Sequence, residues 1–422
     1  MRLVILGGGG FRVPLVYEAV ATSAWGEAIT EVVLHDTSQD RLAAIRRVIG
    51  ERVAQLPRPE AAPALRVTTG LEDALRGAAF VFAAIRVGGA EARTIDERVA
   101  LDLGLLGQET VGPGGLAYAL RTIPVMRRIA ETIARVAPEA WTINFTNPAG
   151  IVTQSMRPVL GERVVGICDT PIGLVRRVGR ALGAEEFDYD YIGLNHLGWL
   201  RGVRVGGVER LPGLLADDAL LDHIEEARLV GKDWVRALGC LPNEYLYYYW
   251  HTDEAIAHIR AAGQTRGQYL AGQQRKFYEE VADPCCPSPL ASWLGALKER
   301  EATYMAEARD EERRAEDAEG GGYQEVALRL MSAIATGQPE RMILNVANGA
   351  AGPRIVPELP ADVVVEVACT VDGAGVRPLP VAPVSLDQLG MMARLRSSEQ
   401  AIAEAALSGD PDRAWEGFST HP

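Results

Sequence analysis

The chain has 422 residues, of which 48% are hydrophobic and 23% charged, and it carries a formal net charge of −13 at pH 7. This length is too great for one ordinary hydrophobic core, so we expect two domains in a globular protein. The acidic surface would repel nucleic acid and anionic lipid, which excludes both as expected partners, and an anionic substrate would need its own basic pocket.

The first part of the chain alternates short apolar runs with amphipathic stretches. The runs that predict buried strands are 2–6, 31–36, 65–70, 80–87, 141–148 and 164–169, and the longest helical pattern covers 116–137. This alternation is typical of βαβ units and a parallel sheet covered on both faces. We therefore expect an α/β fold whose residues 1–168 form a Rossmann-type, NAD-binding domain, on the plan of the malate and lactate dehydrogenases.

The pattern changes in the second part. Residues 189–207 predict one or two longer strands, and helical patterns dominate from about 213 to 310. The charge run at 309–322 predicts a solvated helix end and a flexible loop without chemistry. A helix near 324–336, two further strands and a C-terminal helix follow. We expect residues 169–422 to form a mixed α+β domain for substrate binding and oligomerisation.

The N-terminal stretch MRLVILGGGG lacks the long apolar region of a signal peptide. No run of about 18 uncharged apolar residues predicts a transmembrane helix. The five cysteines are odd in number and scattered, which fits a reducing compartment better than a disulfide framework. We therefore expect a cytoplasmic protein that does not enter the membrane.

A glycine run follows the first predicted strand directly and precedes a helical pattern. Glycines let a backbone approach a pyrophosphate, and a helix N-terminus offers unpaired N–H groups to it. The third glycine of the usual GxGxxG pattern is replaced by Arg12. Asp36 closes the second strand, where an acid would bind the adenosine ribose and favour NAD over NADP. The expected cofactor-binding residues are Gly7, Gly9, Gly10, Phe11, Arg12 and Asp36.

Cys168 and Asp169 end a predicted strand, and Asn195 and His196 follow 28 residues later. A thiolate and a neutral imidazole suit a divalent transition metal, and two protein ligands would leave coordination positions open for a substrate. The alternative for Cys168 is a small buried apolar residue, and the alternative for His196 is a core histidine.

Eight stretches carry a resemblance to a known family: VILGGGGFRVP, AIRVGGAEARTIDE, GLLGQETVGPGG with LRTIP, INFTNPAGIVT, GICDTP, GLNHLGW, LPNEYLYYY and TRG. The chain resembles the NAD- and manganese-dependent family 4 glycoside hydrolases, notably the 6-phospho-β-glucosidases, nearly from end to end. The resemblance implies NAD and Mn²⁺ or another divalent metal as cofactors. It also implies a phosphorylated disaccharide or glucoside as substrate, and a homodimer or homotetramer.

The resemblance further implies roles for single residues. Cys168 and His196 match the metal ligands, and Tyr245 in LPNEY matches the catalytic base, whose pKa would have to be lowered by the metal or by Arg266. The other catalytic residue implied is Asp169, the acid for the leaving oxygen in α-specific members. The substrate-binding residues implied are Arg93 for the 6-phosphate, Asn147 and Asn195 for the sugar, and Arg266.

The family reaction is a hydrolysis that begins with hydride transfer from C3 of the sugar to NAD⁺. Elimination at C1, addition of water and return of the hydride follow, which explains a dinucleotide fold in a glycosidase. Many β-specific members have Asn after the cysteine and α-specific members have Asp, whereas GLNHLGW and LPNEYLYYY look more like the β group. The anomer preference therefore stays open between β and α.

Two other classes of protein share this sheet plan. An NAD-dependent 2-hydroxy acid dehydrogenase would need a His–Asp pair and an arginine for the substrate carboxylate, and it would leave Cys168 and Tyr245 unused. A regulator that senses NAD or a sugar phosphate would need no catalytic base. The residues favour the glycosidase.

Overall fold

The structure is a computed structural model that describes residues 1–422 except 24, 26–27, 310–312, 315–316, 318–321 and 350–351. The strands of the described chain belong to one sheet. Their bounds are β1 (Arg2–Leu6), β2 (Glu31–His35), β3 (Ala64–Thr68), β4 (Phe80–Ala83), β5 (Trp141–Asn144), β6 (Val164–Gly166), β7 (Asp188–Leu194), β8 (Leu197–Val205), β9 (Val208–Glu209), β10 (Leu241–Pro242), β11 (Glu340–Ala347), β12 (Val364–Asp372) and β13 (Gly375–Pro378).

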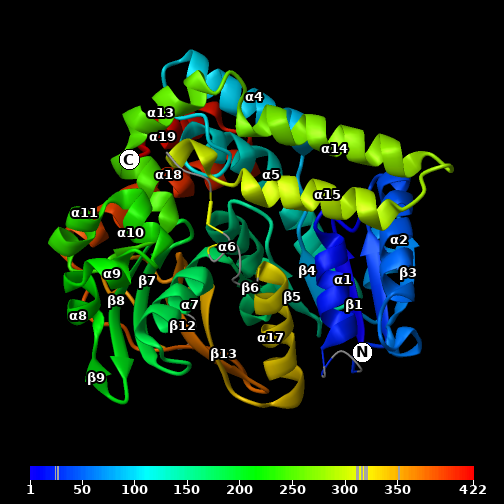
Figure 1. Ribbon diagram of the computed structural model, residues 1–422, viewed down its shortest axis with the longest axis horizontal. Helices are drawn as coiled ribbons and strands as arrows, with labels where there is room; N and C mark the ends of the chain where they lie inside the picture. The colour runs from blue at the N-terminus through cyan, green and yellow to red at the C-terminus, as the bar shows by residue number, and fades with distance from the viewer. Residues whose placement is uncertain (24, 26–27, 310–312, 315–316, 318–321, 350–351) are drawn as a thin grey trace.

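The helices cover the sheet and extend beyond one of its ends (Figure 1). In the first half they are α1 (Val13–Thr22), α2 (Gln39–Ala54), α3 (Leu71–Leu75), α4 (Gly89–Asp102), α5 (Gly112–Val136), α6 (Ala149–Leu160) and α7 (Thr170–Leu182). Those that follow are α8 (Leu211–Ala216), α9 (Asp218–Leu221), α10 (Glu225–Val230), α11 (Lys232–Leu238), α12 (Tyr247–Trp250), α13 (Thr252–Ala261), α14 (Arg266–Ala282), α15 (Pro289–Ala302), α17 (Tyr323–Thr336), α18 (Leu386–Ser408) and α19 (Pro411–Thr420). None of the described helices is long and apolar enough to cross a membrane.

The sheet order explains where a ligand can bind. Strands β3-β2-β1-β4-β5-β6 pair in parallel, which is the strand order of a Rossmann domain. Strand β11 then pairs antiparallel with β6, and β12, β7, β8 and β10 continue the sheet in antiparallel pairs. The predicted fold class, a Rossmann-type sheet with a mixed C-terminal part, is confirmed. The boundary at 168/169 stays a prediction.

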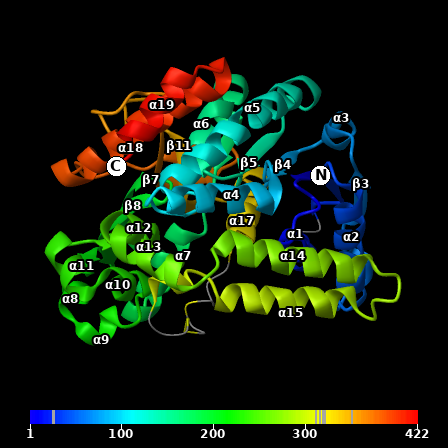
Figure 2. The ribbon, with the colours of Figure 1, turned by 90° about the horizontal axis from the view of Figure 1, so that it is seen from above.

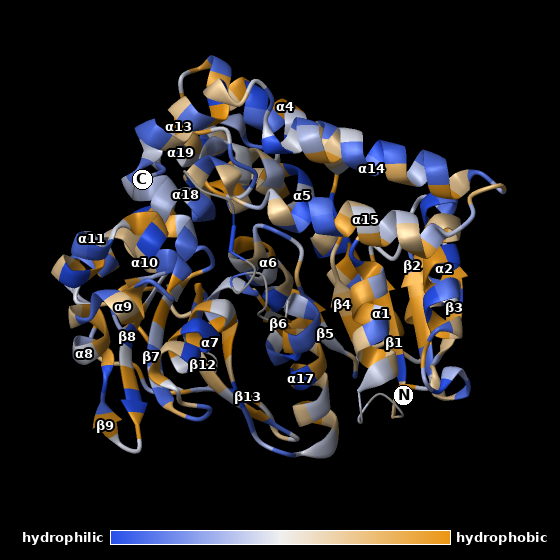
Figure 3. Cartoon of the chain, in the orientation of Figure 1, coloured by the Kyte–Doolittle hydropathy of each residue, from blue (hydrophilic) through white to orange (hydrophobic). Residues whose placement is uncertain are grey.

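Alternation along the strands divides the core into two layers. In β1, Leu3 and Ile5 pack with α1 and α2 on one face, whereas Val4 and Leu6 pack with α5 and α6 on the other. Both faces are covered, so the parallel strands consist almost entirely of apolar residues, as their colour in Figure 3 shows. The polar loops therefore lie at the carboxyl ends of these strands.

Helices α14 and α15 form a long hairpin that lies across the carboxyl ends of the first strands (Figure 2). One end of the hairpin packs on α2, and α14 also contacts α4. Tyr278 donates from α14 to the carbonyl oxygen of Gly9 at 2.6 Å, and Trp293 donates from α15 to that of Phe11 at 2.7 Å. The hairpin therefore covers the glycine loop.

The segment 189–207 forms the two strands β7 and β8, joined by a two-residue turn. The prediction for the charge run at 309–322 is wrong for its described residues. Arg309 and Arg313 are paired with the buried carboxylate of Glu225, and Asp317 is paired with Arg228. The rest of that run lies outside the described residues.

Candidate active site

The glycine loop lies where β1 and β4 end side by side. Gly7 has a φ of 84°, and a Cβ there would lie 2.4 Å from the carbonyl oxygen of Ala84. Only glycine fits such a close approach with positive φ. The N–H of Gly9 donates to Asp36 Oδ2 at 3.0 Å, so the acid at the end of β2 holds the loop. The structure brings the six expected cofactor-binding residues together at this edge.

Arg12 stands in place of the third glycine as the residue before α1. Its guanidinium lies 5.8 Å from the ring centroid of Tyr323, and its buried Nε has no hydrogen-bond partner in the described chain. The loop therefore adds a cation where the usual pattern has none.

His196 occupies the turn between β7 and β8. Leu194 and Leu197, which flank the turn, pair with each other across the hairpin. Its φ is 65°, in the left-handed region that turns normally give to Gly or Asn. The side chain is buried, and its ring stacks on Tyr245 with centroids 3.7 Å apart and an interplanar angle of 3°. A histidine kept in this conformation is an outlier that points to function.

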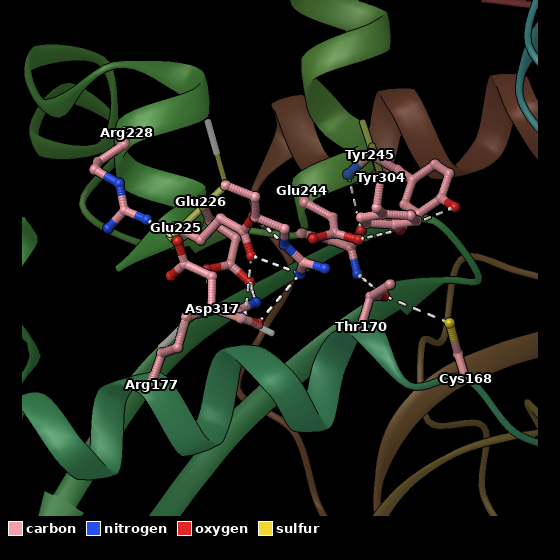
Figure 4. Close-up of polar contacts among 12 residues, drawn as sticks. Cys168, Thr170, Arg177, Glu225, Glu226, Arg228, Glu244, Tyr245, Tyr304 and Asp317 are labelled. Carbon is pink, nitrogen blue, oxygen red and sulfur yellow. Dashed lines mark hydrogen bonds and ion pairs between the residues drawn. The ribbon is translucent and has the colours of Figure 1, made fainter. Parts of the chain in front are cut away.

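Cys168 is joined to the same place through two hydrogen-bonded side chains. Its Sγ lies 3.4 Å from Thr170 Oγ1, which accepts from Asn243 Nδ2 at 2.7 Å. Asn243 Oδ1 in turn accepts from the backbone N–H of Tyr245 at 3.0 Å. Cys168, Tyr245 and His196, which come from different strand ends and a short helical turn, therefore form one connected group. Figure 4 shows Cys168, Thr170 and Tyr245 of this group.

This group fits a divalent metal by its donor chemistry. Burial lowers the pKa of His196 to about 4, so its imidazole is neutral at pH 7, and neither ring nitrogen is hydrogen-bonded within the described chain. Burial and the charges of Glu366 and Asp169 raise the pKa of the Cys168 thiol, and a bound cation would oppose that shift. Among the described residues, no cluster of three or more His, Cys, Asp or Glu side chains could hold a metal. Cys168 and His196 would be a two-ligand site.

Tyr245 lies in a helical turn, Glu244–Leu246, and ends in a chain of hydroxyl groups. Its Oη is 3.4 Å from Tyr304 Oη, and Tyr304 donates to Glu244 Oε1 at 2.7 Å (Figure 4). The hydroxyl of Tyr304 is the donor toward both Glu244 and Tyr245, so its hydrogen bond opposes a rise in the pKa of Tyr245. Burial raises the pKa of Tyr245 well above 10, and the charges of Glu244 and Glu109 raise it further.

Arg93 lies on the buried face of α4 and is held by two carboxylates. Its Nε donates to Glu97 Oε1 at 2.7 Å, and its Nη1 lies 2.9 Å from Glu109 Oε2. Arg86 binds the same oxygen of Glu109. Although burial alone would raise it, Arg86 and Arg93 hold the pKa of Glu109 at about 2.

The remaining predicted residues lie around this group. Asn147 carries a buried Oδ1 without a hydrogen-bond partner in the described chain, so it can accept from a sugar hydroxyl. Asp169 precedes α7, next to Cys168. Arg266 begins α14 and donates to Thr303 Oγ1 and, at 2.8 Å, to the carbonyl oxygen of Arg300.

Asn195 is held by a buried carboxylate without a cationic partner in the described chain. Its Nδ2 donates to Glu366 Oε1 at 3.3 Å, and Tyr191 and Asn345 also donate to Glu366, at 3.0 and 2.9 Å. Burial raises the pKa of Glu366 to about 7, although the three hydrogen bonds oppose this. Glu366 therefore anchors the turn that carries His196.

Several polar residues of the site have no predicted role. Some lie inside the stretches that carry the family resemblance, next to a predicted site residue, and this position could have identified them. Nothing in the sequence distinguishes the others. They are Glu109, Thr170, Asn243, Glu244, Arg300, Tyr304 and Glu366.

Two family models match the chain over almost its whole length. Residues 2–184 match the model described as family 4 glycosyl hydrolase, and residues 191–422 match that of the family 4 glycosyl hydrolase C-terminal domain. The chain belongs to family 4 of the glycosyl hydrolases. The resemblance drawn from the eight stretches is confirmed.

Two family 4 relatives illustrate how far the likeness reaches. A probable 6-phospho-β-glucosidase of Bacillus subtilis (strain 168) is 29% identical, with 100% of this chain and 92% of that protein covered. A maltose-6′-phosphate glucosidase of Fusobacterium mortiferum is 30% identical, with 99% and 92% covered. The relatives thus include enzymes named for different linkages.

Solved structures share the fold. The 6-phospho-β-glucosidase of Thermotoga maritima, solved with manganese, NAD⁺ and glucose 6-phosphate, has a TM-score of 0.82 at 23% identity and covers 100% of this chain and 93% of its own. A 6-phospho-α-glucosidase from gut microorganisms, solved with NAD and Mn²⁺, has a TM-score of 0.78 at 25% identity with the same coverage. A lactate dehydrogenase from a deep-sea metagenome matches at 0.55 and 13% identity, covering 96% of this chain and 98% of its own, so the dehydrogenase-like plan extends beyond family 4.

Proposed function

We propose that this family 4 enzyme hydrolyses 6-phospho-β-glucosides and requires NAD and a divalent metal such as Mn²⁺. The observation that carries the proposal is the connected group of Cys168, Tyr245 and His196 beside a glycine loop closed by Asp36. Relatives named as phosphoglucosidases and solved with both cofactors support it.

When bound, NAD would take up and return a hydride, and the metal would act as a Lewis acid on the sugar hydroxyl oxygens. Cys168 and His196 would hold the metal. Tyr245 would take the proton from C2 of the sugar. Because the protein around Tyr245 raises its pKa, and Arg266 donates elsewhere, the bound metal is the cation that would favour the deprotonated tyrosine.

Asn147 would orient the sugar through its free amide oxygen, and Arg93 would face the 6-phosphate. Asp169 would protonate the leaving oxygen if the substrate were an α-glucoside. The second candidate is therefore a 6-phospho-α-glucosidase, favoured by Asp169 and by the relatives that act on maltose 6′-phosphate by name. A 2-hydroxy acid dehydrogenase is less favoured, because no described carboxylate is hydrogen-bonded to His196.

The test measures nitrophenol release from the β- and α-glucoside 6-phosphates in parallel, with and without NAD⁺ and Mn²⁺, under reducing conditions. Turnover of the β-substrate that needs both cofactors would support the proposal, and faster turnover of the α-substrate would replace it with the second candidate. Net NADH formation from a 2-hydroxy acid would favour the dehydrogenase instead.

His196→Ala tests the metal site inside the same assay. We expect metal-dependent turnover to fall by at least about 10³-fold, while NAD⁺ binding and the unfolding midpoint stay close to those of the wild type. Full activity of this variant after chelation and re-addition of Mn²⁺ would refute the role of His196. His223→Ala, at an exposed position of another segment, is the control.

A further inference from the structure

The arginines near the glycine loop differ in how the protein binds them. Arg93 is paired with two carboxylates, and the guanidinium of Arg266 donates to two oxygen atoms. Arg300, in the last turn of α15, has no carboxylate and no hydrogen-bond acceptor on its guanidinium among the residues that the structure describes. Its Nη1 is buried and without a hydrogen-bond partner, so Arg300, like Arg12, is a cation beside the glycine loop that no described carboxylate pairs.

The position of Arg300 connects two parts of the site. Its guanidinium lies 5.4 Å from the ring centroid of Phe11 in the glycine loop. Its carbonyl oxygen accepts from Arg266, which starts α14, and the next residue, Gly267, donates its N–H to Glu97 on α4 at 2.7 Å. Arg300 therefore lies where the α14–α15 hairpin meets both the loop and the partner of Arg93.

The charges around Arg300 are mostly of its own sign. Burial, together with the charges of Arg12, Arg93 and Arg266, lowers the pKa of Arg300 to about 9, and the charge of Glu109 opposes this. A buried cation among other cations is costly unless an anion joins it. A doubly charged anion with several oxygen atoms would meet that need, because a guanidinium can donate to two of them at once.

We infer that Arg300 binds a phosphoryl group of a ligand in this site and is a specificity-determining residue beside Arg93. The inference rests on the proposed function, which identifies the ligands. These ligands offer two sources of the phosphoryl group. One is the 6-phosphate of the sugar, and the other is the pyrophosphate of the dinucleotide above the glycine loop. The ring of Phe11 beside its guanidinium and the hydrogen bond from Arg266 to its carbonyl oxygen place Arg300 next to the glycine loop and the start of α14.

The experiment measures the dissociation constants of glucose 6-phosphate and of NAD⁺ separately by calorimetry, with the full-length protein. The variants are Arg300→Gln, which removes the charge, and Arg300→Lys, which keeps it. Lys298→Gln, an exposed position on the same helix, is the matched control. Thermal unfolding confirms that each variant is folded.

We expect Arg300→Gln to raise the dissociation constant of glucose 6-phosphate at least tenfold and to leave that of NAD⁺ within twofold of the wild-type value. In Lys298→Gln, both dissociation constants should stay within twofold of the wild type. A loss confined to NAD⁺ would assign the phosphoryl group to the dinucleotide and support the inference. Arg300→Lys should lose less affinity than Arg300→Gln, because it keeps the positive charge. A packing defect at Phe11 would not produce this difference. Unchanged binding of both ligands in folded Arg300→Gln would overturn the inference.

The outcome is separable from that of the proposed function. If the wild type binds both ligands but hydrolyses neither glucoside, the function is refuted and the effect of Arg300 on binding still decides the inference. If hydrolysis is present and Arg300→Gln binds and turns over like the wild type, only the inference fails.

Discussion

Two groups of charged side chains lie near Tyr245, and they are built differently. The Glu225 cluster consists of Glu225 and Glu226 with Arg177, Arg309 and Arg313, and every one of its side chains has an oppositely charged partner. Figure 4 shows Arg177 beside Glu225 and Glu226. The arginine cluster consists of Arg86, Arg93, Glu97, Glu109 and Arg300, and Arg300 has no such partner among the described residues.

The difference indicates what each cluster is for. A buried pair with all partners present contributes to a unique structure and offers nothing to a ligand. The Glu225 cluster holds the segment that carries Tyr304 against the helices next to Tyr245. In the arginine cluster, Arg300 has no described carboxylate partner, and an anionic ligand would supply the missing negative charge. The following experiments test this distinction, beginning with the largest expected effect.

Glu225→Ala should lower the free energy of unfolding by about 3–5 kcal/mol, because it leaves Arg177, Arg309 and Arg313 buried without their shared carboxylate. Urea denaturation measures this. Glu254→Ala, whose side chain is exposed and paired with His251 alone in the described chain, should cost less than about 0.5 kcal/mol. Equal effects of the two substitutions would contradict a structural role for the cluster.

Arg93→Gln should lower the free energy of unfolding by about 2 kcal/mol, since it removes charged hydrogen bonds to Glu97 and Glu109. Arg300→Gln removes no such bond and should leave the unfolding midpoint near that of the wild type. The comparison is made in the same denaturant series without ligand. A larger loss for Arg300→Gln than for Arg93→Gln would mean that Arg300, too, is paired.

Glu244 gives a pH-dependent test next to the Glu225 cluster. Burial and the charge of Glu225 raise its pKa to about 7, so the folded state binds a proton more tightly than the unfolded chain. Its contribution to stability is therefore greatest at low pH and is lost as pH rises from about 4.5 through 7.

Glu244→Gln should remove this part of the pH dependence and reduce the loss between pH 5 and pH 8 by about 2–3 kcal/mol. Unfolding is followed at both pH values. Glu366 titrates over a similar range in both proteins, so the difference between variant and wild type is the relevant quantity. Parallel pH profiles would show that Glu244 is ionised throughout.

The smallest effect concerns inorganic phosphate as a simple ligand of the arginine cluster. At a phosphate concentration equal to its Kd, the folded state should gain about 0.4 kcal/mol, and Tm should rise by about 1 °C. Chloride at the same ionic strength should not reproduce the shift, and Arg300→Gln should abolish it. An equal shift with chloride would point to general ionic screening.

The sequence predicted the sheet better than the site. Alternating apolar runs identify the strands around Val4 and Val33 because both faces of a parallel sheet are buried. The glycine loop and Asp36 were recognisable from spacing alone. Cys168 and His196 were singled out by their ligand chemistry and Tyr245 through the family resemblance. Their metal and catalytic roles remain proposals, as do the cytoplasmic location and the oligomeric state.

What escaped prediction depends on contacts between distant segments. Arg300 lies in KEREA, which looks like an exposed helix face, and its surroundings come from the loop around Phe11 and from Arg93. Arg309 looked solvated, but its partner Glu225 is 84 residues away in sequence. Charge runs reveal composition, whereas burial is decided by the fold.

At His196, the left-handed backbone conformation lowers stability, whereas the proposed metal binding requires the imidazole. Glycine or asparagine would relieve about 1 kcal/mol of strain in that turn, yet either would remove the imidazole. Directed evolution for heat resistance alone would therefore reward the loss of the proposed metal ligand. A library selected for stability should be screened for turnover at every round, because its most robust members at this turn would be inert.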